Sequence, residues 1–252
     1  MSEFVTWNLG GRVASIVLQR PERGNAITSQ MLGSIASACD AITASGADVV
    51  LLRAEGPNFS VGFDLDEIEA GNTPDGAVAG ARAVSALLDL GAVTVARLHG
   101  WVVGGGAALA AACDLRVGDP TVTIRIPEVP LGIPLGWGAM PLLVAEMGPS
   151  AAKDLVMTGR DMDAAEAHRR GLLTRLADAG GLDAEVERLI GQLLAAPVGP
   201  LRATKQQADA AAAVIRTGDD DAARLIHAVT SSGFREVFRR YLERVRGTQD
   251  RT

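Results

Sequence analysis

The sequence is poor in the residue types that build disulfide-rich, metal-binding or hydrolytic sites. Its 252 residues include 2 cysteines, 3 histidines and 4% aromatic residues. Cys39 and Cys113 are far apart and lie in apolar surroundings, which excludes a disulfide framework and a metal-binding cysteine pair. The isolated histidines have no serine or cysteine at the spacing of a nucleophile elbow. We therefore expect buried free thiols in a reducing compartment, no metal and no hydrolytic triad.

Long apolar runs and an excess of positive charge are also missing. No apolar run approaches the length of a membrane span, and Met1 to Val5 lack the pattern of a secretory signal. The 24 basic and 30 acidic residues give a net charge of −6, whereas a nucleic-acid-binding protein needs clustered positive charge. We expect a cytoplasmic protein with neither a nucleic acid nor a membrane as partner.

Short apolar stretches alternate with helix-like segments in the first half of the chain, which favours an α/β fold. Thr28 is expected to cap a helix that reaches about Ala44. A loop is predicted from Asn72 to Gly76, and a helix from Gly76 to Leu90. The predicted strands are Val5 to Asn8, Val13 to Leu18, Val49 to Ala54, Val93 to Leu98, Leu115 to Val117 and Val122 to Ile126.

From Gly136 onward the pattern is mainly helical, with glycines and prolines between the segments. The last predicted helix runs from Ala222 to Arg246. We find no internal repeat and no low-complexity linker.

Two glycine-containing segments follow apolar strands and precede helices. Gly104, Gly105 and Gly106 come after the apolar stretch that ends at Leu98 and open into an alanine-rich helix. The segment from Phe59 to Leu65 follows the strand at Val49. Unpaired N–H groups at such helix ends stabilise anions, and glycine lets a ligand approach the backbone closely. Two such sites can supply two donors to one developing oxyanion.

Together with two further segments, Arg20 to Ala26 and Ile126 to Gly132, these motifs resemble the crotonase superfamily, also called enoyl-CoA hydratase/isomerase. The four motifs occur in the order and spacing of that family, and the resemblance covers nearly the whole chain. It implies a spiral core of ββα units, assigned to residues 1–195, and a C-terminal helical region, residues 196–252, that builds trimers or dimers of trimers. It also implies an acyl-CoA substrate and no separate cofactor, because coenzyme A is part of the substrate.

The resemblance assigns the two oxyanion donors to the backbone N–H groups of Phe63 and Gly105. Phe63 stands where relatives more often have alanine, which affects pocket shape more than a main-chain donor. Asp66 stands where relatives often have a basic residue. The expected substrate-binding residues are Ala26, Ser60, Gly62, Asp64, Leu65, Asp66, Gly104, Ala108, Trp137, Arg239 and Arg240, the last two as contacts of the CoA 3′-phosphate.

Family hydratases carry two glutamates, and this sequence has Ala108 at the first position and Glu128 at the second. Gly136 replaces the aspartate of the family's dienoyl isomerases and dehalogenases. A lone glutamate can still move one proton, as in the Δ3,Δ2-enoyl-CoA isomerases. Glu128 lies among apolar residues that should raise its pKa. The competing interpretation is a surface carboxylate paired with Arg125.

The expected reaction is therefore a shift of a double bond from 3-enoyl-CoA to 2-enoyl-CoA. One alternative is a hydratase or a carbon–carbon-cleaving enzyme in which Asp64 or Asp66 assists Glu128. Another is an acyl-CoA binder without activity. Trp101, Trp137 and Met140 are either core residues or the lining of an acyl tunnel, and a tunnel lined by both tryptophans would suit a short or flat acyl chain.

Overall fold

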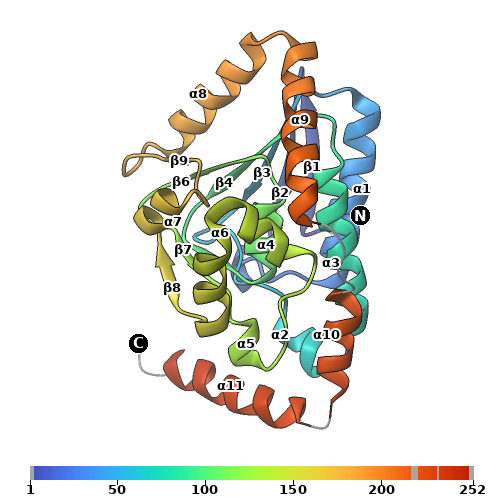
Figure 1. Ribbon diagram of the computed structural model, residues 1–252, viewed down its shortest axis with the longest axis vertical. Coiled ribbons are helices and arrows are strands. Elements are labelled where there is room, and N and C mark those ends of the chain that lie inside the picture. The colour runs from blue at the N-terminus through green and yellow to red at the C-terminus, as the bar shows by residue number, and fades with distance from the viewer. Residues whose placement is uncertain (1–2, 217–220, 232, 250–252) are drawn as a thin grey trace.

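The computed structural model describes residues 3–216, 221–231 and 233–249. Its strands form two sheets surrounded by helices (Figure 1), which confirms the α/β prediction. The larger sheet has the order β1-β2-β3-β4-β6-β9, and the smaller has the order β5-β7-β8. The strands are β1 Val5–Gly10, β2 Val13–Leu18, β3 Val49–Ala54, β4 Val93–Leu98, β5 Trp101–Val103, β6 Leu115–Gly118, β7 Thr123–Arg125, β8 Asp161–Asp163 and β9 Arg175–Leu176.

The larger sheet is parallel apart from its first strand. β1 and β2 form an antiparallel hairpin, and β2, β3, β4, β6 and β9 run parallel. The central strand β3 is apolar on both faces because each face is covered by helices. Val50 and Leu52 belong to the main core, whereas Val49 packs in a second cluster with Leu182 and Val186.

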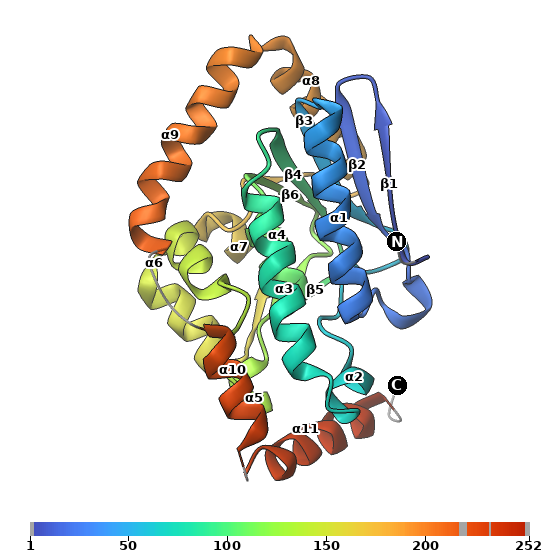
Figure 2. The ribbon, with the colours of Figure 1, turned by 90° about the vertical axis from the view of Figure 1, so that its right-hand side faces the viewer.

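Helices cover both faces of this sheet. α1 and α3 stand side by side over one face (Figure 2), and residues of α8 pack on the other. Thr28 caps α1 as predicted, because its Oγ1 accepts a hydrogen bond of 3.2 Å from the N–H of Met31. The longer helices are α1 Ser29–Ser45, α3 Thr73–Leu88, α6 Ala139–Thr158, α8 Leu182–Ala195, α9 Val198–Arg216, α10 Asp221–Thr230 and α11 Phe234–Gln249; the shorter are η1 Pro21–Arg23, α2 Leu65–Glu69, α4 Gly105–Ala111, α5 Glu128–Leu131 and α7 Ala164–Arg170.

The chain passes repeatedly between the two sheets. β4 of the larger sheet leads to β5 of the smaller, and after α4 the chain returns to β6 and then to β7. Isolated bridges, Ser60 to Val102 and Ile27 to Phe63, tie the loops beside β5 together. The triple glycine therefore follows β5, and not β4 directly as the apolar pattern suggested.

Two helix boundaries differ from the predictions. α3 already begins at Thr73, inside the predicted loop, because proline is tolerated in the first turn and Pro74 lies there. The predicted helix from Ala222 to Arg246 is two helices, α10 and α11, which are separated near Ser231 and Gly233. This break lets α11 turn beneath α5 (Figure 1).

The C-terminal helices reach different parts of the core. α9 runs along the outside of the molecule (Figure 2) and is attached by ion pairs of Lys205 with Asp114, 2.5 Å, and of Arg202 with Asp48, 3.0 Å. The division at residues 195 and 196 falls between α8 and α9, and both this division and the trimer stay predictions. None of the helices in the described ranges is long and apolar enough to cross a membrane.

Candidate active site

A cavity of about 890 Å³ opens where the loop before α2, the start of α4, α5 and α11 meet. Its wall contains charged residues, among them Arg23, Asp66 and Arg125, and apolar residues of α3, α10 and the loop after α5. A cavity of this size suits a ligand that has both a polar and an apolar portion.

Glu128 is the first residue of α5 and projects into this cavity. The backbone brings its carboxyl group directly over Gly104, where an added Cβ would lie 2.7 Å from Glu128 Oε1. Gly104 also has a φ of +48°, which side chains rarely adopt. Glycine at this position therefore gives the carboxyl group its place beside the first turn of α4.

The Glu128 carboxyl group is poorly solvated although its residue lines the cavity. Glu128 Oε2 is buried and has no hydrogen-bond partner among the described residues. This burial raises the pKa of Glu128 from its ordinary value of 4.5 to about 7, opposed only by a hydrogen bond from its own backbone. Arg125 pairs with Asp161 instead, at 2.5 Å, so the surface-carboxylate interpretation is wrong. A group with this pKa can both take up and release a proton near neutral pH.

Two backbone N–H groups on the cavity wall lack an acceptor. Among the described residues, no hydrogen bond engages the N–H of Phe63 or that of Gly105. The bridge between Ile27 and Phe63 uses the neighbouring groups, because Ile27 N donates to Gly62 O and Asp64 N donates to Ile27 O, each at 2.8 Å. Both free donors belong to residues that line the cavity.

Ser60 supports the Phe63 loop from behind. Ser60 is fully buried and lies outside the cavity wall. Its Oγ donates to Asn25 O at 2.8 Å and accepts from the N–H of Gly62 at 3.1 Å. The Asn25 side chain in turn donates to the carbonyls of Glu55 and Asn58. These contacts fix the backbone that carries the Phe63 N–H.

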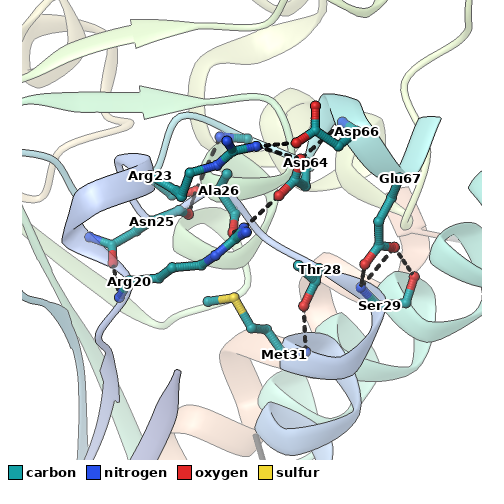
Figure 3. A network of polar contacts seen from close by, with 12 residues as sticks. Arg20, Arg23, Asn25, Ala26, Thr28, Ser29, Met31, Asp64, Asp66 and Glu67 are labelled. Carbon is teal, nitrogen blue, oxygen red and sulfur yellow. Dashed lines mark hydrogen bonds and ion pairs between the residues drawn. The ribbon is translucent and has the colours of Figure 1, made fainter. Parts of the chain in front are cut away.

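The two aspartates after Phe63 are engaged by arginines (Figure 3). Asp64 caps α2 and forms a 2.5 Å ion pair with Arg20, and Arg23 reaches Asp66 and, at 3.6 Å, Asp64. Burial opposes ionisation of Asp64, but these hydrogen bonds and charges outweigh it and hold its pKa below the usual range. A carboxylate stabilised in this way is a weak proton acceptor, so Asp64 is poorly suited to act as a second base.

Most of the residues predicted from the sequence meet at this one cavity. The cavity is lined by Ala26, Gly62, Phe63, Asp64, Leu65, Asp66, Gly104, Gly105, Ala108, Glu128 and Trp137. Arg239 and Arg240 do not line it. They are exposed on α11 and pair with Glu236 and, for Arg239, also with Glu243. Their role at a CoA phosphate stays a prediction.

Sequence reasoning missed several side chains of the wall, among them Tyr241 and Arg125. Tyr241 comes from α11 and lies near enough to Glu128 for that carboxylate to contribute to the raised pKa of the tyrosine, which burial mainly causes. Arg125 stacks over the ring of Trp101, 5.0 Å from its centroid. The amphipathic pattern of α11 was the sequence signal that could have indicated Tyr241.

A buried carboxyl group of raised pKa and two N–H donors without an acceptor among the described residues therefore lie on the wall of one cavity that contains both charged and apolar side chains. The enoyl-CoA hydratase/isomerase family model matches residues 9–248, and the chain belongs to that family. The chain is therefore a crotonase-type enzyme, and the expected fold is confirmed.

Individual relatives agree with this assignment. YhaR of Bacillus subtilis (strain 168), whose name assigns it provisionally to the enoyl-CoA hydratases/isomerases, is 32% identical over 208 residues, 81% of each chain. A crystal structure of a Thermobifida fusca YX protein in complex with CoA is 29% identical, with a TM-score of 0.77 over 93% of this chain and 94% of that one. An enoyl-CoA hydratase from Mycobacterium avium subsp. paratuberculosis K-10, 24% identical, shares the fold with a TM-score of 0.87 over 94% and 98% of the two chains.

Proposed function

We propose that this enzyme shifts the double bond of a 3-enoyl-CoA into conjugation with the thioester, giving a 2-enoyl-CoA. The observation that carries the proposal is the environment of Glu128, a buried carboxyl group with a pKa of about 7 whose Oε2 has no partner in the described part of the chain. The thioester substrate is supported by the family and by the relative that was crystallised with CoA.

The reaction begins with the thioester oxygen accepting hydrogen bonds from the N–H groups of Phe63 and Gly105. Removal of an α-proton by ionised Glu128 puts negative charge on this oxygen, and the two donors stabilise the resulting enolate. The same carboxyl group then returns the proton to the γ-carbon, so that Glu128 ends the cycle ionised again. No water molecule is consumed or released in this reaction.

Hydration would need a second group that holds and activates water, and Ala108, Asp64 and Asp66 are poorly suited to this role. Ala108 occupies the position of the first family glutamate and is buried. Asp64 and Asp66 are paired with Arg20 and Arg23. Among the described cavity residues, Glu128 is thus the carboxyl group best suited to proton transfer.

The test compares 3-hexenoyl-CoA with crotonyl-CoA as substrates of the purified enzyme and of Glu128→Gln. Isomerisation of the first substrate, with a loss of about 10²- to 10⁴-fold in kcat in the variant, supports the proposal. Glu166→Gln is the matched control, because Glu166 pairs with Arg160 outside the cavity.

Water addition to crotonyl-CoA at a rate above that of isomerisation would contradict the proposal and favour a hydratase. Tight binding of both esters without either reaction would indicate an acyl-CoA binder. Titration calorimetry with each ester separates this last outcome from a protein that does not bind them.

A further inference from the structure

The loop after α5 carries Trp137 into the cavity in a conformation that large residues avoid. Trp137 has a φ of +62°, and it shares the left-handed region with only one other non-glycine residue among those described, Asn25. Such a backbone state costs free energy and persists where the surroundings enforce it. Trp137 is only 7% exposed, yet it forms part of the cavity wall.

Two glycines on different helices make room for the indole ring. A Cβ at Gly80 of α3 would lie 2.0 Å from the ring, and a Cβ at Gly105 of α4 would lie 2.3 Å from it. Phe63 contacts the ring edge-on, with centroids 6.0 Å apart and planes at 87°. The indole is therefore enclosed by both residues that carry the proposed oxyanion donors.

α10 holds the loop from its other side. Asp221 Oδ2 accepts a 2.5 Å hydrogen bond from the N–H of Gly138, the residue after Trp137. Leu225 occupies the space beside Gly136, where an added Cβ would lie 2.9 Å from Leu225 Cδ2. The loop is thus anchored on both sides of the indole, which fixes the ring as a rigid part of the wall.

The position of the Trp137 ring restricts the space for the acyl chain. A thioester oxygen bound at Phe63 and Gly105 puts the first acyl carbons beside the indole, because the ring packs on Gly105 itself. The apolar wall also includes Gly76, Ala77, Ile133, Leu135 and Leu225. A chain that extends past these groups has to displace the ring or turn away from it.

We propose that Trp137 limits the length of the acyl group, so that the enzyme takes short acyl-CoA esters of the butyryl to hexanoyl class. The proposal rests on the function proposed above for its choice of ligand, since it places the thioester oxygen at Phe63 and Gly105. It assigns Trp137 a part in specificity and none in proton transfer.

The experiment measures equilibrium binding of saturated esters, which cannot react, by titration calorimetry with acetyl-, butyryl-, hexanoyl-, octanoyl- and decanoyl-CoA. Each methylene that enters an apolar site strengthens binding about fourfold. In the wild-type enzyme we expect the affinity to rise up to hexanoyl-CoA and then to stay level or fall. In Trp137→Ala the rise should continue, so that the ratio of octanoyl to hexanoyl affinity increases by about 15-fold for the two further buried methylenes.

Trp137→Leu is the second variant, because it removes the ring with a smaller cavity and less risk to folding. It should shift the ratio in the same direction. Trp7→Ala is the matched control. It removes an indole from β1, outside the cavity wall, and should leave the chain-length ratio unchanged.

Two results would overturn the assignment: a wild-type affinity that keeps rising to decanoyl-CoA, or a ratio that is the same in wild type and both Trp137 variants. The measurements on the wild-type enzyme do not depend on whether either variant folds. The proposed reaction can fail independently of this assignment. If the enzyme binds short esters selectively but does not isomerise 3-hexenoyl-CoA, the proposed reaction is wrong and the role of Trp137 in chain-length specificity still holds.

Discussion

Replacing Glu128 by glutamine should stabilise the protein, and the gain should grow with pH. Burial raises the pKa of this carboxyl group from 4.5 to about 7, so the folded state holds the proton more tightly than the unfolded state. The stability that the protonated Glu128 carboxyl group contributes is fully present below pH 4.5 and is lost as the pH rises toward 7. Above pH 7 the loss is constant, because both states are then ionised.

The size of the effect follows from the shift itself. The pKa rises by about 2.5 units, and each unit corresponds to 1.36 kcal/mol. Wild type should therefore lose about 3 kcal/mol relative to Glu128→Gln between pH 4.5 and pH 8. Glutamine has nearly the same shape as the neutral acid and leaves the packing over Gly104 unchanged.

The assay is urea unfolding of both proteins at one protein concentration, followed by circular dichroism at several values between pH 4.5 and pH 8. Only the difference between the two proteins is interpreted, because titration of other groups cancels in it. Glu166→Gln is the control of opposite sign. Its pairing with Arg160 holds the pKa of Glu166 below its ordinary value of 4.5, so the stability lost in Glu166→Gln should be nearly the same at every pH of the assay and should shrink only at more acidic pH.

A constant difference between wild type and Glu128→Gln across this range would refute the reasoning. It would mean that water reaches the carboxylate in the folded state. The pKa would then be ordinary, and the proposed acid/base role of Glu128 would lose its physical basis.

Three further predictions concern the same site. The kcat/KM for isomerisation should rise tenfold per unit up to about pH 7 and then level off, because only ionised Glu128 accepts the α-proton; an activity independent of pH between 5 and 7 would contradict this. Gly104→Ala should abolish most activity, because the added Cβ would lie 2.7 Å from Glu128 Oε1. The control is Gly46→Ala, where φ is +73° and the added Cβ would meet open space; this variant should lose only stability. Arg20→Met should destabilise the protein by about 2 kcal/mol in urea unfolding because it removes the 2.5 Å partner of buried Asp64, while Arg82→Met, in an exposed pair with Asp40, should have little effect.

The sequence by itself determined the local elements and the residues proposed to react. Thr28 before an apolar stripe predicts the start of α1, and an apolar run such as Val49 to Ala54 predicts a buried strand, because these signals depend on neighbouring residues. The four motifs likewise named Phe63, Gly105 and Glu128, and all three line one cavity.

Only the tertiary structure decided how the environment changes these groups. The sequence could not show whether Glu128 pairs with Arg125, because Asp161, the actual partner of Arg125, comes from β8, 36 residues away. Nor could it show that Gly80 on α3 and Gly105 on α4 enclose the Trp137 ring, or that α11 brings Tyr241 to the cavity. Burial, charge and pocket shape arise from contacts between segments distant in sequence, which a local pattern does not encode.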